Sequence, residues 1–304
     1  MANYIEMYLK NFLTLILILS FGCPVQAQLR PEMQGALESL EDLRIRNRPE
    51  EALSLLKKSI EKKGNTADEL TYLYAHQSLI YGSIDSLLLS KRSLDNSQRF
   101  AQQAKTNEPK AVAYRAEAAL NRQLGLPDEV TKSALKGLQL LEKSDKDLPN
   151  KYALNYLLYG VYSRWGDDEK MDRYIRQCAY YALKDNNYNA LVNVNNGLSS
   201  MFQARYEKQQ ERSLLDSSFR YLQKSFDLHQ QYPKRVSTNS FVITCINLAN
   251  FYFEFSKDPL PERKKQAFHY LRFAEAELKT KHAAADYWVN VFGIKSGFAL
   301  QENN

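Results

Sequence analysis

The chain of 304 residues repeats one arrangement of apolar and polar positions three times in its second half. Apolar residues recur at the three-to-four-residue spacing of an amphipathic helix, so each unit predicts two helices joined by a turn. In each first helix, an apolar residue precedes a mostly small neighbour and an aromatic residue four positions on: Leu158, Tyr159 and Tyr162; Leu198, Ser199 and Phe202; Leu248, Ala249 and Tyr252. The second helices carry the matching sets Met171, Ile175 and Cys178; Ser218, Leu222 and Ser225; Ala267, Leu271 and Ala274. One such pair cannot bury its own apolar face, so neighbouring pairs must stack.

Weaker versions of the pattern extend the array toward the N-terminus. Pro49 opens a predicted helix, since its missing N–H would have no helical partner at that position anyway. Thr66 and Glu69 have the spacing of a capping box that starts the next helix. Predicted repeats lie near residues 34–62, 66–105, 110–142, 151–185, 190–230 and 238–280, with an incomplete terminal helix near 283–300. Residues 28–304 are therefore predicted to form an all-α solenoid of about six helix pairs.

The repeated positions resemble the tetratricopeptide (TPR) pattern. That resemblance implies a right-handed superhelix whose first helices line a concave groove that binds a peptide or protein partner. Alignment on Leu158, Leu198 and Leu248 gives the expected groove-facing residues Tyr156, Ser163, Arg164, Asn196, Ser200, Gln203, Asn250, Phe253 and Glu254. Asn and Gln side chains can donate to and accept from a peptide backbone, and aromatic rings supply apolar anchors.

Residues 1–27 have the features of a cleaved secretory signal peptide. Lys10 precedes an uncharged run over residues 12–21, and Val25 and Ala27 supply small side chains at the positions that a signal peptidase reads. The run is about ten residues long, too short for a hydrocarbon core of about 30 Å. We therefore expect an exported, periplasmic protein. Cys23 stands in a shifted version of a bacterial lipoprotein box, so a lipid anchor at Cys23 is the alternative.

An export signal followed by divergent, Tyr-rich repeats also resembles the sensory part of certain bacterial membrane-bound regulators. In those proteins a periplasmic TPR array precedes one transmembrane helix and a cytoplasmic output module. The predicted terminal helix around Trp288 has no second helix after it, so this resemblance implies a truncated or split member. The most apolar later segment, residues 241–255, is short and contains Asn247 and Glu254. We expect it to be a buried solenoid helix and not a membrane span.

Composition supports a folded helical chain. It is 44% apolar and 25% charged, and only 11 Gly and 9 Pro argue against a turn-rich β fold. The net charge is +6, and the densest basic clusters, around residues 57–63 and 263–265, belong to amphipathic helices. Solvated helix faces explain such clusters, so we expect no nucleic-acid partner.

The sequence contains none of the strong catalytic motifs, neither a phosphate-binding glycine loop nor H-E-x-x-H, C-x-x-C or G-x-S-x-G. The four histidines, His76, His229, His269 and His282, are scattered over different predicted helices. We therefore predict no catalytic residue, metal or cofactor. The acidic residues 167–169 are expected to cap a helix, and Cys178 and Cys245 to be buried free thiols.

Three functions remain open on this basis. The first is a non-enzymatic exported protein that binds a peptide or protein partner in its groove. The second is the sensory fragment of a membrane-bound TPR transcriptional regulator or signalling protein. The third is a lipid-anchored envelope or glycan-related protein built on a helical-repeat scaffold.

Overall fold

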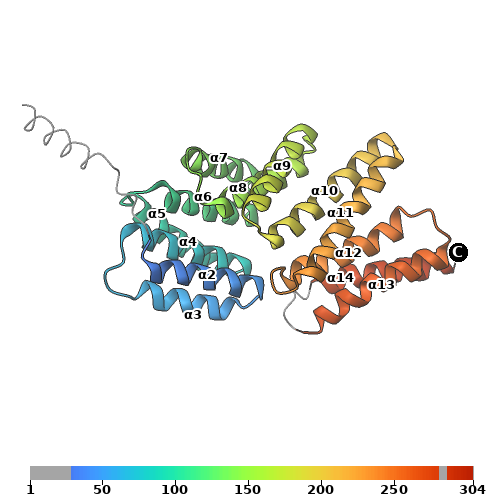
Figure 1. The fold of residues 1–304 in the computed structure, drawn as a ribbon, viewed down its shortest axis with the longest axis horizontal. Helices are drawn as coiled ribbons and strands as arrows, with labels where there is room; N and C mark the ends of the chain where they lie inside the picture. The colour runs from blue at the N-terminus through green and yellow to red at the C-terminus, as the bar shows by residue number, and fades with distance from the viewer. Residues whose placement is uncertain (1–28, 281–285, 304) are drawn as a thin grey trace, which may run out of the picture. The chain divides into compact units, whose positions relative to one another are not determined.

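The computed structural model describes residues 29–280 and 286–303, and all of its helices lie in one compact unit, residues 31–304. The described residues contain helices and no strands (Figure 1). The helices are α2 (Pro31–Ile45), α3 (Pro49–Ile60), α4 (Ala67–Ser83), α5 (Leu87–Ala101), α6 (Asn107–Gln123), α7 (Pro127–Leu141), α8 (Leu148–Trp165), α9 (Asp168–Lys184), α10 (Tyr188–Gln209), α11 (Arg212–Gln231), α12 (Thr238–Glu254), α13 (Leu260–Leu278) and α14 (Tyr287–Glu302). The predicted signal peptide and Cys23 lie outside the described residues.

Consecutive helices form antiparallel pairs because short turns join them. In the first four pairs the turn contains one residue with left-handed backbone: Asn47, Asp85, Gly125 and Gly166, at φ values between 51° and 70°. Glycine adopts this region without steric cost, and Asn and Asp tolerate it better than other residues. A residue that tolerates left-handed backbone therefore ends each of these first helices and lets the chain reverse.

Polar caps begin several helices. Thr66 Oγ1 accepts a hydrogen bond from the Glu69 N–H at 3.2 Å, and the Glu69 carboxylate accepts one from the Thr66 N–H at 2.9 Å. This confirms the predicted capping box at the start of α4. The Asp167 carboxylate accepts from the Lys170 N–H at 3.0 Å, which confirms the expected cap of α9.

The pairs stack side by side, so that each first helix packs on its own second helix and on the preceding pair. Apolar residues at the repeat positions form the core: Leu158, Ile175, Cys178, Leu222, Leu248, Ala249, Ala267, Leu271 and Ala274 are buried. The array is thus an all-α solenoid, as the repeat pattern predicts. Figure 1 shows the pairs following one another from α2 to α13.

The second and fifth pairs bury serines at second-helix positions where the third, fourth and sixth have other small or apolar residues. In the fifth pair, the Ser199 and Ser218 hydroxyls lie 2.7 Å apart across α10 and α11, and Ser225 donates to the Val192 carbonyl at 3.2 Å. Because each buried hydroxyl has a partner, close helix packing is retained without a desolvation penalty.

The apolar segment over residues 241–255, Cys178 and Cys245 lie in the interior, as the sequence predicts. The segment over residues 241–255 forms α12, most of whose side chains are buried in the solenoid. None of the described helices is long and apolar enough to cross a bilayer. Cys178 and Cys245 are buried free thiols, as expected.

The last helix, α14, packs against α12 and α13 through Val291, Ile294 and Phe298. The Phe298 ring is fully buried and lies 4.9 Å from the Phe253 ring in an edge-to-face contact. Phe292, on the opposite side of the same helix, is 58% exposed. One apolar stripe of α14 therefore makes the buried contact with the array, and the ion pairs Lys264–Glu302 and Lys295–Glu275 join α13 to α14 beside it.

We expect Phe298→Ala to lower the free energy of unfolding by about 3–5 kcal/mol, or to detach α14 alone, because a buried ring is replaced by a cavity. Urea unfolding would give the stability, and hydrogen exchange would show whether α14 amides lose protection first. Phe292→Ala is the matched control on the same helix, and its stability should stay within about 0.5 kcal/mol of wild type. Equal effects of the two variants would contradict this account of α14.

Candidate functional site

A cavity of about 460 Å³ lies on the side of the array formed by the first helices. It is within the size range of ligand sites in proteins. Its lining comes mainly from α2, α4, α6, α8, α10 and α12, with Ser90 from α5, so helices far apart in the sequence face one space. The polar lining residues are Glu41, Arg44, Asn47, His76, Ser78, Ser83, Ser90, Arg115, Arg122, Gln123, Tyr156, Asn189, Asn193, Ser237, Asn239 and Ser240.

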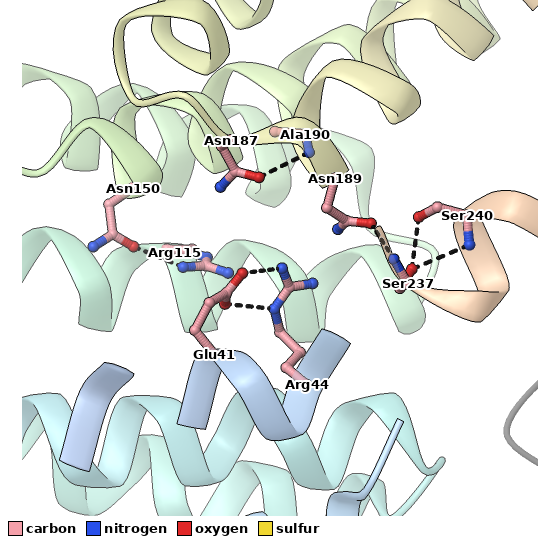
Figure 2. A network of polar contacts seen from close by, with 9 residues as sticks. All are labelled: Glu41, Arg44, Arg115, Asn150, Asn187, Asn189, Ala190, Ser237 and Ser240. Atoms are coloured by element: carbon pink, nitrogen blue, oxygen red, sulfur yellow. Dashed lines mark hydrogen bonds and ion pairs between the residues drawn. The ribbon is translucent and has the colours of Figure 1, made fainter. Parts of the chain in front are cut away.

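One wall of the cavity carries arginines. Arg44 donates to Glu41 on the same helix through Nε at 2.7 Å and Nη2 at 2.5 Å. Arg115 of α6 makes no ion pair among the described residues; its Nη1 donates to Asn150 Oδ1 at 2.8 Å. Figure 2 shows Glu41 and Arg44 pointing from α2 toward Arg115. The cavity therefore holds a guanidinium that no carboxylate of the described lining neutralises.

The titration behaviour of this wall follows from burial and from the clustered charges. Burial lowers the pKa of His76 to about 4, and Arg115 adds to the shift, so His76 is neutral at pH 7. Burial also lowers the pKa of Arg115, and the charge of Arg44 acts in the same direction. Burial alone would raise the pKa of the Glu41 carboxyl, but Arg44 brings it below its ordinary value.

The charges of the described lining do not balance. Arg44, Arg115 and Arg122 are cationic, and Glu41 is the one acidic residue among the lining side chains. The cavity thus has a surplus of two positive charges. Charge of one sign in a sheltered cleft attracts ligands of the opposite sign.

The part of the lining that α8 and α10 contribute carries Tyr156 and amides. Tyr152 and Tyr156 of α8 stack with ring centroids 5.7 Å apart. Asn193 of α10 makes a side-chain hydrogen bond with Tyr152. Asn189 Oδ1 accepts from the Ser237 N–H at 3.0 Å, which joins the starts of α10 and α12 (Figure 2). Amide groups both donate and accept, so this part of the lining can pair with the backbone of an extended chain.

A buried carboxylate behind the cationic wall holds Arg115 in place. Asp147 Oδ1 accepts from Asn150 Nδ2 at 2.6 Å, and Asn150 in turn accepts from Arg115. The other Asp147 oxygen, Oδ2, is buried without a hydrogen-bond partner, and the residue has left-handed backbone at φ 60°. Burial raises the pKa of Asp147 to about 6.

The predicted groove residues of α8 have different surroundings. Tyr156 lines the cavity. Arg164 lines a separate pocket of about 110 Å³ together with Arg122, near the turn at Gly125. Ser163 is exposed near the C-terminal end of α8.

The predicted residues of α10 make contacts within the array. Asn196 is buried and donates to Thr244 Oγ1 of α12 at 2.8 Å. Gln203 donates to Ser218 Oγ of α11 at 3.0 Å, and Ser200 donates to the Asn196 carbonyl at 3.2 Å. The amide of Asn196 thus joins neighbouring pairs, away from the cavity lining.

Of the predicted residues of α12, Phe253 contacts α14. Phe253 packs on Phe298, and its carbonyl accepts from Arg263 Nη1 at 2.9 Å. Asn250 is partly buried and Glu254 is exposed. None of these three is among the cavity-lining residues.

The arginine wall was not predicted, because the alignment on Leu158, Leu198 and Leu248 covers only the three clearest repeats. The third pair contains a spacing that predicts these arginines. Arg115, Arg122 and Gln123 stand at the same distances before Gly125 as Tyr156, Ser163 and Arg164 stand before Gly166. Aligning the turn glycines would have placed all three at groove-facing positions, and the structure places all three in the cavity lining.

Comparison with known proteins supports the helical-repeat fold. No protein-family model matches the sequence, and no curated protein matches it. The chain is similar to the crystal structure of BtubC (BKLC) from P. vanneervenii, with a TM-score of 0.56 and 10% identity over 79% of this chain and 92% of that one. At such low identity the likeness concerns the fold alone.

A second similar structure is a Signal Transduction ATPase with Numerous Domains (STAND) protein with a tetratricopeptide repeat sensor, PH0952 from Pyrococcus horikoshii. The TM-score is 0.53 and the identity 15%, over 88% of this chain. The match spans 41% of the STAND protein, so this chain corresponds to less than half of it. The helical-repeat fold is therefore shared with a protein that contains a TPR sensor.

We expect Asp147→Asn to raise the free energy of unfolding by about 2 kcal/mol at pH 7.5. The folded-state pKa is raised, so between pH 3.8 and about 6 the folded chain binds more protons than the unfolded chain. Stability from this group therefore falls as the pH rises through that window. Asparagine keeps an oxygen for Asn150 and tolerates the left-handed backbone.

Urea unfolding of both proteins at pH 4 and pH 7.5 measures this effect, and the advantage of the variant should largely disappear at pH 4. The exposed neighbour Asp145 provides the control, since Asp145→Asn should change stability little at either pH. An advantage of equal size at the two pH values would rule out titration of Asp147 as its cause.

Proposed function

We propose that this protein is a non-enzymatic binding protein that holds an extended, acidic segment of a partner protein in the first-helix cavity. The observation that carries the proposal is the unbalanced charge of the described lining, three arginines against Glu41. Arg115 supports it further, because a guanidinium without an ion pair has donors available for a carboxylate.

The part of the lining from α8 and α10 supports an extended backbone as the bound form. Tyr156 presents its ring to the cavity, with Tyr152 stacked behind it, and Asn189 and Asn193 contribute amides to the lining. An extended chain needs hydrogen-bond partners for its backbone groups when it leaves water, and amide side chains supply both donors and acceptors. The similar STAND protein contains a TPR sensor, and we propose ligand recognition as the general role of the array here as well.

The test is selection of peptides from a random display library against the full chain, followed by fluorescence anisotropy of the selected peptides. We expect enrichment of Asp and Glu, and binding that weakens as salt is added. Arg115→Gln should weaken binding by about tenfold or more, since a charge-assisted bond contributes about 1.5–3 kcal/mol.

Arg272→Gln is the matched control, because Arg272 is an exposed arginine on the second helix α13. This variant should bind the peptides as wild type does. Selected peptides that show no acidic preference and bind Arg115→Gln and Tyr156→Ala at full strength would place the binding site elsewhere.

We propose further that the protein is exported to the periplasm after cleavage of residues 1–27. The apolar run over residues 12–21 and the small residues before Gln28 support this. Intact-mass measurement of the protein purified from its native host should give a chain that begins at Gln28. A chain that begins at Cys23 and carries added lipid mass would establish the anchored alternative, and one that retains Met1 would contradict export by this signal.

A further inference from the structure

A second groove, of about 660 Å³, lies between the second helices α9 and α11, with α10 as its floor. Its lining runs from Arg176 to Leu183 on α9, from Leu191 to Leu198 on α10 and from Tyr221 to Gln231 on α11. A helix turns about 100° per residue, so Leu191, Val194 and Leu198 lie on the side of α10 opposite Asn189 and Asn193. The groove is therefore distinct from the first-helix cavity.

The floor and walls of this groove are mainly apolar. Val194 and Leu198 are almost fully buried, whereas Leu183 on the α9 wall is 62% exposed. On the α11 wall, Tyr221 stacks on Phe202 of α10 with centroids 5.7 Å apart, which holds the ring at the edge of the groove. The exposed Leu183 and the partly exposed Leu191, Tyr221 and Leu228 provide the apolar area that a partner can bury.

The walls favour a helical occupant over an extended one. They are themselves helices, whose backbone N–H and C=O groups are bonded internally. The lining offers just two side-chain amides, Asn195 and Gln231. An extended segment would leave many backbone groups without partners there, whereas a helix satisfies its own. The floor from Leu191 to Leu198 is about 10 Å long, which matches two helical turns.

The charges around the groove indicate which charge the flanks of that helix carry. Arg176 Nε donates to Asp172 Oδ2 at 2.6 Å, and Arg205 Nη2 to Asp172 Oδ1 at 3.4 Å, so two guanidinium groups share one carboxylate. Lys224 on the opposite wall makes no ion pair among the described residues; its Nζ lies 5.2 Å from the Tyr221 ring centroid. Asp227 is the other acidic residue, so the groove carries a surplus of one positive charge.

We propose that the groove between α9 and α11 binds an amphipathic α-helix of a partner protein, apolar on the side that meets α10 and acidic along its flanks. Apolar side chains at helical spacing would pack over Leu191, Val194 and Leu198, with Leu183 and Tyr221 on either side. Acidic side chains would meet Arg176 and Lys224. This is recognition of a helix in a groove, and it does not depend on the proposed role of the first-helix cavity.

The test uses two synthetic peptides of about 14 residues, or about four helical turns. Both have leucine at positions 1, 5, 8 and 12; one carries glutamate and the other lysine at the flanking positions. Binding of each labelled peptide to the full chain is measured by fluorescence anisotropy at low and at physiological salt. We expect the acidic peptide to bind at least about tenfold more tightly, and the difference to shrink with salt.

Leu183→Glu should weaken binding of the acidic peptide about tenfold or more, because a carboxylate would stand on the apolar wall beside acidic flanks. The matched control is Leu135→Glu, which changes an exposed leucine on another second helix, α7, and should leave binding unchanged. Lys224→Glu should reduce the preference for the acidic over the lysine peptide. Arg115→Gln should have no effect, which separates this groove from the first-helix cavity.

Two results would overturn the proposal. One is binding of both peptides with equal affinity, or binding of the acidic peptide that Leu183→Glu leaves unchanged. The other is a concentration-dependent dimer in sedimentation velocity that Leu183→Glu abolishes, since the groove would then be covered by a second copy of this chain.

Discussion

Each helix pair in this array has an apolar stripe that its own two helices cannot cover. Leu158, Ile175 and Cys178 in the fourth pair are buried because neighbouring pairs lie against them. The hydrophobic effect therefore acts mainly between pairs, and every pair needs its neighbour to be stable. All surfaces of the molecule follow from this requirement, because stacking determines which sides of each helix remain accessible.

α10 illustrates how one helix acquires two different surfaces. Its Asn189 and Asn193 side contributes to the first-helix cavity, and its Leu191, Val194 and Leu198 side forms the floor of the second groove. The chemistry of the two sides differs in kind. Amides and arginines suit a ligand whose backbone needs hydrogen bonds, whereas an apolar floor between helices suits a ligand that has already satisfied its own. One solenoid can in this way offer sites for two conformations of bound chain.

The cationic wall shows how clustered charge is held for binding. Glu41 pairs with Arg44, and Asn150 links Arg115 to Asp147. These contacts position the guanidinium groups without neutralising all of them. A buried carboxylate that lacks one hydrogen bond, as Asp147 does, lowers stability at neutral pH. The same carboxylate positions Arg115 through Asn150. Such a loss of stability at a binding site is consistent with functional sites being less than optimally stable.

Local signals in the sequence determined the helices. Helical periodicity, the capping box at Thr66, the turn residue Gly166 and the apolar repeat positions all predict elements that the structure contains. These features depend on a few neighbouring residues, so they can be read without knowing how the pairs are stacked.

The site was predicted only in part, and the tertiary structure decided the rest. Tyr156 lines the cavity, but Asn196 joins α10 to α12 and Phe253 packs on α14, although all three come from the same repeat alignment. Which side of a first helix faces the open space depends on the rotation between adjacent pairs. That rotation results from the packing of side chains distant in sequence, which no single helix encodes. The sequence by itself therefore determined the repeating unit, and the stacking of the units decided where Arg44 and Arg115 come together.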